Sequence, residues 1–151
     1  MKDRPQSSPA PADILLVDDN KLGLVARKSV LEELGYRITT AAEGHEALEL
    51  YSRRTFDLVI TDFKMPKMDG LELIKRIRHL VPDAPIILIS GYADALGMTE
   101  ANTGADAVIA KSANEVPALI RSVNRLLRRA APKKPPAAQR GQGRAKRQGA
   151  Q

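Results

Sequence analysis

The stretch Asp57-Leu-Val-Ile-Thr-Asp62 is an apolar run that ends in a carboxylate, and it lies near the middle of a 151-residue chain. The stretch Ile14-Leu-Leu-Val-Asp-Asp19 has the same form, with an apolar run closed by adjacent aspartates. Short continuous apolar runs are typical of strands that are buried on both faces of a parallel sheet. A segment with apolar residues at helical spacing follows each run, which indicates strand–helix units.

This alternation continues along the chain. The predicted strands are residues 14–17, 37–41, 58–60, 85–89 and 107–110. The predicted helices are residues 22–34, 46–51, 71–80, 93–103 and 115–129, and the first is expected to bury Leu22, Val25, Val30, Leu31 and Leu34. Strands separated by single helices predict an α/β fold with a parallel sheet covered on both faces. Right-handed crossovers then favour a doubly wound five-stranded parallel sheet of order 2-1-3-4-5, the flavodoxin-like (βα)5 arrangement.

The two ends of the chain differ from its centre in composition. Residues 1–12 are rich in Pro and Ser, and residues 131–151 are rich in Pro, Ala, Gln, Gly and Arg. Such segments bury too little apolar surface to offset chain entropy, so we predict a disordered N-terminal extension, a folded domain at 13–130 and a disordered tail at 131–151. Six basic residues and no acidic residue lie within 132–151, so residues 1–131 hold 24 − 6 = 18 basic side chains against 18 acidic ones. The net charge of +6 therefore belongs to the tail.

Several classes of protein are disfavoured by composition. The chain has no cysteine, which excludes disulfides and thiolate metal sites. No apolar run approaches the roughly 20 residues that a bilayer requires. Residues 1–12 lack the apolar core of a secretory signal. We therefore expect a cytoplasmic protein without membrane association.

Polar side chains follow four of the predicted strands. Asp18 and Asp19 follow the first strand, Asp62 closes the third, Ser90 the fourth and Lys111 the fifth. In the order 2-1-3-4-5 these strand ends are adjacent, and ligands of such sheets bind beyond the carboxyl ends of the strands. Each residue alone fits a helix cap, a turn or a solvated side chain. Their joint placement predicts a binding site.

Carboxylates crowded at one point repel one another and are costly to desolvate, and a hard dication relieves both effects. Oxygen ligands without His or Cys select Mg²⁺, with Mn²⁺ as an alternative, over zinc. Phosphoryl transfer depends on positioning and charge neutralisation, with an aspartate as nucleophile. Lys111 can neutralise one phosphate oxygen and Ser90 can donate a hydrogen bond to another.

Taken in order, these motifs resemble the receiver domains of two-component response regulators, over about residues 13–129. The matching stretches are Ile14-Leu-Leu-Val-Asp-Asp19, Asp57-Leu-Val-Ile-Thr-Asp62, Met65-Pro-Lys-Met-Asp-Gly70, Ile86-Ile-Leu-Ile-Ser90 and Gly104-Ala-Asp-Ala-Val-Ile-Ala-Lys111. The resemblance implies that Asp62 is the phospho-acceptor and that Ser90 and Lys111 assist it. It also implies that Mg²⁺ is held by Asp18, partly through water, by Asp19 and Asp62, and by the main-chain carbonyl of Lys64. A histidine kinase or a histidine phosphotransfer protein would be the donor.

The sequence departs from the family pattern at three places. Ser112 follows Lys111 where the family usually has proline, and Val108 stands where the family has its switch aromatic. A relay from Ser90 to an aromatic residue therefore cannot operate in its usual form. Lys64 and Tyr92 lie two residues past Asp62 and Ser90, where they would line the approach of water. We hypothesise that they slow hydrolysis of the acyl phosphate.

These features predict a stand-alone receiver whose phosphorylation changes its binding to an unknown output protein. A phosphorelay intermediate that passes the group onward from Asp62 is equally compatible. A hydrolase on a similar sheet is disfavoured, because the position of its second aspartate is Lys64. We therefore predict self-catalysed phosphoryl transfer rather than a true enzyme. Non-specific nucleic-acid binding by the basic tail is a weaker alternative, since it would be salt-dependent at most.

Overall fold

The computed structural model describes residues 11–130. Most of the predicted N-terminal extension and all of the tail at 131–151 lie outside the described residues, so the predictions about them stay predictions. The strands are β1 (Asp13–Val17), β2 (Arg37–Ala41), β3 (Leu58–Asp62), β4 (Ile86–Ser90) and β5 (Ala107–Ala110). The helices are α1 (Lys21–Glu33), α2 (Gly44–Arg53), α3 (Gly70–Leu80), α4 (Glu100–Thr103) and α5 (Glu115–Ala130).

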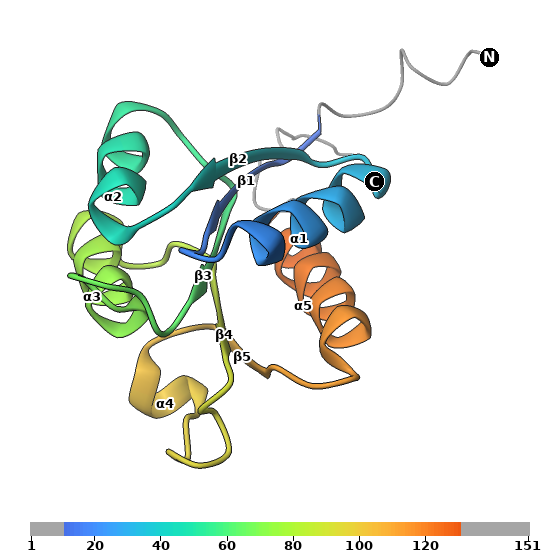
Figure 1. Ribbon diagram of the computed structural model, residues 1–151. Coiled ribbons are helices and arrows are strands. Elements are labelled where there is room, and N and C mark those ends of the chain that lie inside the picture. The colour runs from blue at the N-terminus through green and yellow to red at the C-terminus, as the bar shows by residue number, and fades with distance from the viewer. Residues whose placement is uncertain (1–10, 131–151) are drawn as a thin grey trace, which may run out of the picture.

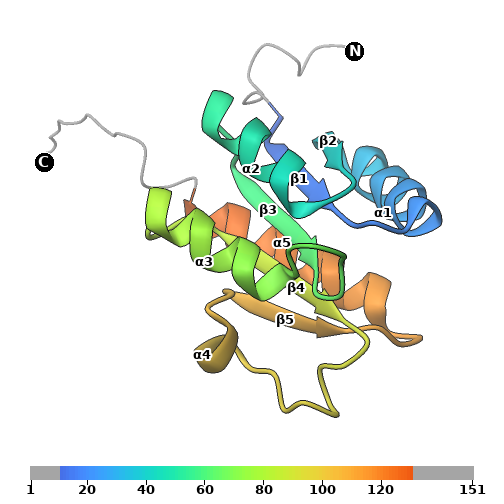
Figure 2. The ribbon, with the colours of Figure 1, turned by 60° about the vertical axis from the view of Figure 1, so that its left-hand side comes forward.

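The strands form one parallel sheet of order β2-β1-β3-β4-β5, which confirms the predicted topology. In Figure 1 the sheet is seen nearly edge-on, with α1 and α5 on one side and α2 and α3 on the other. Figure 2 shows the strands side by side, with their carboxyl ends at one edge of the sheet. The chain runs from β1 outward to β2 and then returns past β1 to β3, so the ends of β1 and β3 flank the switch point.

Alternate residues of each strand point into two separate cores, as the pleat of a strand requires. Leu15 and Val59 face the core under α2 and α3. Ile14 and Ile60 face the core under α1 and α5. Because both faces are covered, β3 and β4 are buried along their whole length. Polar side chains at the ends of these central strands are therefore attached to backbone that is buried and packed on both faces.

The helix α3 begins at Gly70, after the loop 63–69 that follows β3, and two residues favour that start. The side chain of Asp69 caps the helix by accepting from the main-chain nitrogen of Glu72 at 2.9 Å. Gly70 packs against the backbone at the end of β3, where an added Cβ would overlap the main-chain oxygen of Asp62. Gly70 also donates from its nitrogen to the oxygen of Phe63 at 2.7 Å. This contact fixes the loop that follows Asp62.

The prediction of a helix over residues 93–103 is wrong for most of its length, because α4 covers only Glu100–Thr103. Gly97 has a positive φ of 60°, which interrupts a right-handed helix. Thr99 then starts α4 with a capping box, in which its side chain accepts from Asn102 and the Asn102 side chain accepts from Thr99. A strong local start signal thus places the helix later than the apolar pattern suggested.

The predicted buried face of α1 is also partly wrong. Leu22 and Val25 are 81% and 66% exposed, whereas Arg27 and Leu31 are the buried residues of this helix. The helix is therefore rotated so that a charged residue, rather than the first two apolar ones, faces the interior. Among residues 11–130, no helix combines the length and the apolar character that a membrane span needs.

Candidate functional site

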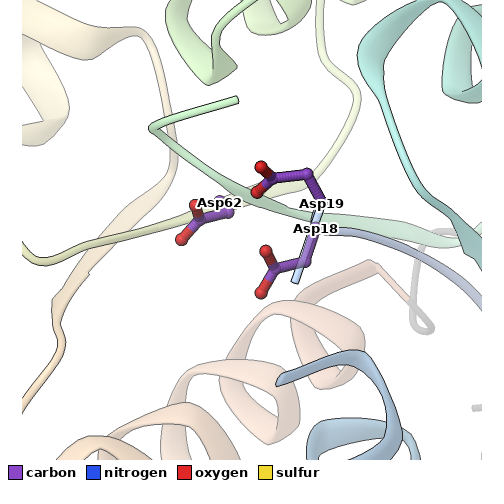
Figure 3. A group of neighbouring side chains, drawn as sticks. All are labelled: Asp18, Asp19 and Asp62. Atoms are coloured by element: carbon purple, nitrogen blue, oxygen red, sulfur yellow. The ribbon is translucent and has the colours of Figure 1, made fainter. Parts of the chain in front are cut away.

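Three aspartates come together at the carboxyl ends of β1 and β3. Each of Asp18, Asp19 and Asp62 offers a carboxylate oxygen, and these oxygens all lie within 4.8 Å of one another. Figure 3 shows the three carboxylates directed to the same side, beyond the ends of the strands. Asp18 and Asp62 are buried and Asp19 is exposed. The structure therefore brings together the carboxylates that the sequence predicted as one site.

Asp18 is held at both of its carboxylate oxygens. Its Oδ1 accepts from the main-chain nitrogen of Asn20 at 3.0 Å. Its Oδ2 accepts from Nη1 of Arg27 at 2.6 Å, and both residues are buried. Charge-assisted hydrogen bonds of this kind are short and strong, so the orientation of Asp18 is fixed.

Arg27 also pairs with the first residue of α5. Its Nε donates to Glu115 Oε2 at 2.7 Å, so one guanidinium connects β1 with α5. Burial lowers the pKa of Arg27, but the hydrogen bonds and charges of Glu115 and Asp18 outweigh burial and raise this pKa. The interpretation of the sequence missed Arg27. One signal was available, because Arg27 lies four residues before the buried Leu31, at a spacing that shares a helix face.

Gly23 makes the contact between Arg27 and Asp18 possible. It lies four residues before Arg27 on α1, where a Cβ would come within 2.7 Å of Asp18 Oδ2 and 3.1 Å of Arg27 Nη1. Real Cβ atoms do not tolerate the first of these distances without a shift of neighbouring atoms. A larger residue at this position would therefore push the guanidinium and the carboxylate apart.

Asp62 lies opposite the lysine at the end of β5. Lys111 Nζ is 2.6 Å from Asp62 Oδ1, in an ion pair in which the side chain of Asp62 is 4% exposed and that of Lys111 is 37% exposed. Burial raises the pKa of Asp62, with a further contribution from Asp18, although the nearby Lys111 and Arg27 act in the opposite direction. Among residues 11–130, the partner of Asp62 Oδ1 is the ammonium of Lys111, in an ion-pair contact rather than a hydrogen bond of regular geometry. The buried carboxylate is thus balanced by one cation at one of its two oxygens.

Ser90 ends β4 between these two groups, and it is buried. Its hydroxyl oxygen accepts from the main-chain nitrogen of Tyr92 at 2.9 Å, so the loop after β4 restrains it. The Tyr92 ring packs edge-on against Phe63, with 5.9 Å between ring centroids, and Lys64 Nζ is 5.9 Å from the Tyr92 centroid. The side chains of Lys64 and Tyr92, which follow two different strands, are therefore neighbours beside the site.

The donor set fits a hard dication. The clustered oxygens come from carboxylates alone, and two of these carboxylates, Asp18 and Asp62, are buried. A hard cation such as Mg²⁺ binds oxygen ligands and keeps several waters, which a cluster with one exposed member allows. The main-chain carbonyl of Lys64 lies in the loop that begins next to Asp62, where it remains a predicted ligand.

Comparison with known proteins gives relatives that are longer than this chain. The transcriptional regulatory protein ZraR of Escherichia coli O157:H7 is 37% identical over 94 residues, which cover 62% of this chain and 21% of ZraR. The chain thus spans about a fifth of the length of this relative.

Two solved structures match nearly their whole length. The response regulator TrrA of Thermotoga maritima, in complex with Mg²⁺ and BeF, is 37% identical with a TM-score of 0.69, covering 76% of this chain and 98% of that one. The receiver domain of the sensor histidine kinase PA1611 of Pseudomonas aeruginosa holds a magnesium ion in its active-site cleft. It is 28% identical with a TM-score of 0.71, covering 78% of this chain and 98% of that one. The family model of the response regulator receiver domain matches residues 14–124, and the chain belongs to this family.

Proposed function

We propose that this receiver domain accepts a phosphoryl group on Asp62 in a Mg²⁺-dependent reaction and signals through changed binding to another protein. The observation that carries the proposal is the environment of Asp62. This carboxylate is buried at a strand end, lies beside Asp18 and Asp19, and faces Lys111 at 2.6 Å. Such an arrangement combines a fixed nucleophile with the charges needed to neutralise a transferred phosphoryl group.

The donor is a histidine kinase or a histidine phosphotransfer protein. A carboxylate oxygen of Asp62 attacks phosphorus, the P–N bond to the donor imidazole breaks, and the imidazole retains the electron pair and takes a proton. The product is an acyl phosphate on Asp62. Hydrolysis by water later releases inorganic phosphate and restores the carboxylate. The domain catalyses its own modification and does not turn over an external substrate.

Each residue has a separate task in this reaction. Lys111 neutralises charge on a phosphoryl oxygen, and the Ser90 hydroxyl donates to another when it turns away from the Tyr92 nitrogen. Asp18 and Asp19 would hold Mg²⁺ together with Asp62 and the carbonyl of Lys64. The ion, when bound, supplies positive charge that offsets the clustered carboxylates and the incoming phosphoryl oxygens.

The contact between Lys64 and Tyr92 supports a second part of the proposal, which concerns the lifetime of the acyl phosphate. Their side chains lie together beside Asp62, the ammonium 5.9 Å from the ring centroid. We expect them to hinder the water that attacks phosphorus, so Lys64→Ala and Tyr92→Ala should each shorten the lifetime of the phosphorylated protein. Equal lifetimes in both variants and the wild type would remove this part of the proposal.

The proposed function is tested by incubation with acetyl phosphate and Mg²⁺, followed by intact mass measurement. The wild type should gain the mass of one phosphoryl group. Asp62→Asn should gain none, and removal of Mg²⁺ by a chelator should abolish the gain in the wild type. Asp83→Asn is the matched control, because Asp83 is an exposed aspartate outside the cluster. Modification of Asp62→Asn at the wild-type rate would reject Asp62 as the acceptor.

A further inference from the structure

We propose that Arg27 is a positioning residue that competes with Mg²⁺ for Asp18 and links the metal site to the start of α5. This inference rests on the proposed function in so far as Asp18 belongs to the Mg²⁺ site. It adds a residue that lies outside the predicted site and whose contacts reach from β1 to α5.

The first step of the argument is the charge that Arg27 brings to the cluster. Arg27 is buried, and its Nη1 lies 2.6 Å from Asp18 Oδ2. A second cation, Lys111, occupies Asp62 Oδ1. Without a metal ion, each buried aspartate of the cluster thus has its own side-chain cation. An arriving dication must share Asp18 with a guanidinium that is already hydrogen-bonded to it.

The second step concerns the other side of the guanidinium. Nε of Arg27 donates to Glu115 at 2.7 Å, through a nitrogen that the contact with Asp18 does not use. Arginine has several donors in a fixed planar group, so one side chain can hold two carboxylates at once. When Mg²⁺ weakens the hold on Asp18, Arg27 stays attached to Glu115. Metal binding therefore changes the contact at the first residue of α5.

Gly23 is an independent observation that supports the importance of the ion pair between Arg27 and Asp18. Its φ is not in the left-handed range, so backbone conformation does not require glycine at this position of α1. Glycine costs about 1 kcal/mol relative to alanine within a helix. The reason for its presence is space, because a Cβ would crowd both Asp18 Oδ2 and Arg27 Nη1. A groove of about 290 Å³ beside this contact, lined in part by Gly23, Arg27 and Glu115, leaves the guanidinium room to shift.

The test is the affinity for Mg²⁺ alone, measured by isothermal titration calorimetry. Arg27→Met should bind Mg²⁺ about tenfold more tightly than the wild type, the size of a typical coupling between two binding events. Glu115→Gln should bind Mg²⁺ more weakly, since it removes the charge that draws Arg27 away from Asp18. Arg76→Met is the matched control, because Arg76 pairs with Glu72 on an exposed helix face, and its Mg²⁺ affinity should not change.

A variant without a charge change separates competition from general electrostatics. Gly23→Ala should also tighten Mg²⁺ binding, because the methyl group separates Arg27 from Asp18. The same change in the Arg27→Met background should not tighten Mg²⁺ binding further, because only the contact of the methyl group with Asp18 Oδ2 then remains. Arg27→Lys keeps a positive charge beside Asp18 and should keep most of the wild-type affinity, and a tenfold tighter Mg²⁺ affinity in this variant would contradict competition by charge at Asp18. It also protects the test against a failure of Arg27→Met to fold.

The link to α5 is read from amide chemical shifts. Addition of Mg²⁺ should shift the amide signals of Glu115 and Val116 in the wild type, and these shifts should disappear in Arg27→Met. The competition would be refuted if Arg27→Met bound Mg²⁺ with wild-type or weaker affinity. A wild type that does not bind Mg²⁺ at all would instead overturn the proposed function, so the two failures are distinguishable.

Discussion

Lys111 Nζ lies 2.6 Å from Asp62 Oδ1, although the strand β4 lies between their two strands. Asp62 ends β3 and Lys111 follows β5, and these two strands are not neighbours in the sheet. Gly91, which follows β4, lies beside this contact, and a Cβ at that position would be in ordinary contact with Lys111 Cδ, at 3.8 Å. Asp62 and Lys111 therefore pair across the width of one strand, and the space beside them admits a small side chain.

The first prediction concerns this pair. Lys111→Met should slow phosphorylation by acetyl phosphate about 100-fold, as loss of one charge-stabilising donor typically does. Lys75→Met, at an exposed position of α3, should react at the wild-type rate. The measurement is the time course of intact mass at fixed Mg²⁺ concentration. An unchanged rate in Lys111→Met would show that Lys111 does not act in the transfer.

The second prediction concerns the stability of the metal-free protein. Burial raises the pKa of Asp62 above its ordinary value of 3.8. A raised carboxyl pKa means that the fold favours the protonated form, so Asp62 lowers the free energy of unfolding as pH rises from 3.8 through the folded pKa. Asp62→Asn removes this ionisation, and we expect it to be more stable at pH 7 by about 1 kcal/mol.

Urea unfolding in the presence of a chelator, followed by circular dichroism, measures this difference. The advantage of Asp62→Asn should shrink as pH is lowered toward 3.8, where wild-type Asp62 becomes protonated. Asp83→Asn serves as the control, and its stability should follow the wild type over the same range. A less stable Asp62→Asn at pH 7 would contradict the prediction.

The third prediction concerns the loop after β3. Gly70→Ala should lower the free energy of unfolding by about 3 kcal/mol, in the range of overpacking against rigid atoms. The added Cβ meets the main-chain oxygen of Asp62 and the Cα of Phe63, and backbone atoms of a central strand cannot move aside. Gly91→Ala is the matched control, with an expected change below about 1 kcal/mol. Equal stability of the two variants would show that the loop yields easily.

The fourth prediction compares two arginines of α3. Arg78 donates to the carbonyl oxygens of Gly104 and Pro82 and pairs with Asp106 at 3.0 Å. Arg78→Met should cost about 2 kcal/mol of stability, because the partly buried oxygens of Ala84 and Asp106 lose this donor. Arg76→Met removes only an exposed pair with Glu72 and should cost no more than about 0.5 kcal/mol. Thermal unfolding of both variants decides whether Arg78 ties α3 to the turn before β5.

Much of the fold could be predicted because its signals are local. The apolar run before Asp62 and the five repeated strand–helix units specify a parallel sheet, and handedness leaves few orders of strands. The cluster of Asp18, Asp19 and Asp62 follows from that order alone, because carboxyl ends of adjacent parallel strands meet at one edge. The start of a helix depends instead on single caps, and the cap at Thr99 makes α4 begin later than predicted, so it fills only the last part of the predicted range 93–103.

The role of Arg27 could not be predicted in the same way. Its partners lie 9 and 88 residues away, and one of them depends on where α5 begins. An apolar pattern suggested Leu22 and Val25 as the buried residues of α1, yet pairing with Asp18 and Glu115 decided the rotation of the helix. The spacing of Arg27 to Leu31 places it on the buried face of α1, but it does not identify its partners, because they are distant in sequence and only the assembled fold brings them to Arg27.

The brevity of α4 has a consequence for how this side of the molecule responds to events at the strand ends. A single four-residue turn held by one capping box lies far below the length at which a helix is stable by itself. Its amides should exchange with deuterium well before those of α3, in a local opening that leaves the sheet intact. The segment between β4 and β5 can therefore become more or less ordered when the environment of Ser90 changes, at little energetic cost. A longer helix would have to move as a whole.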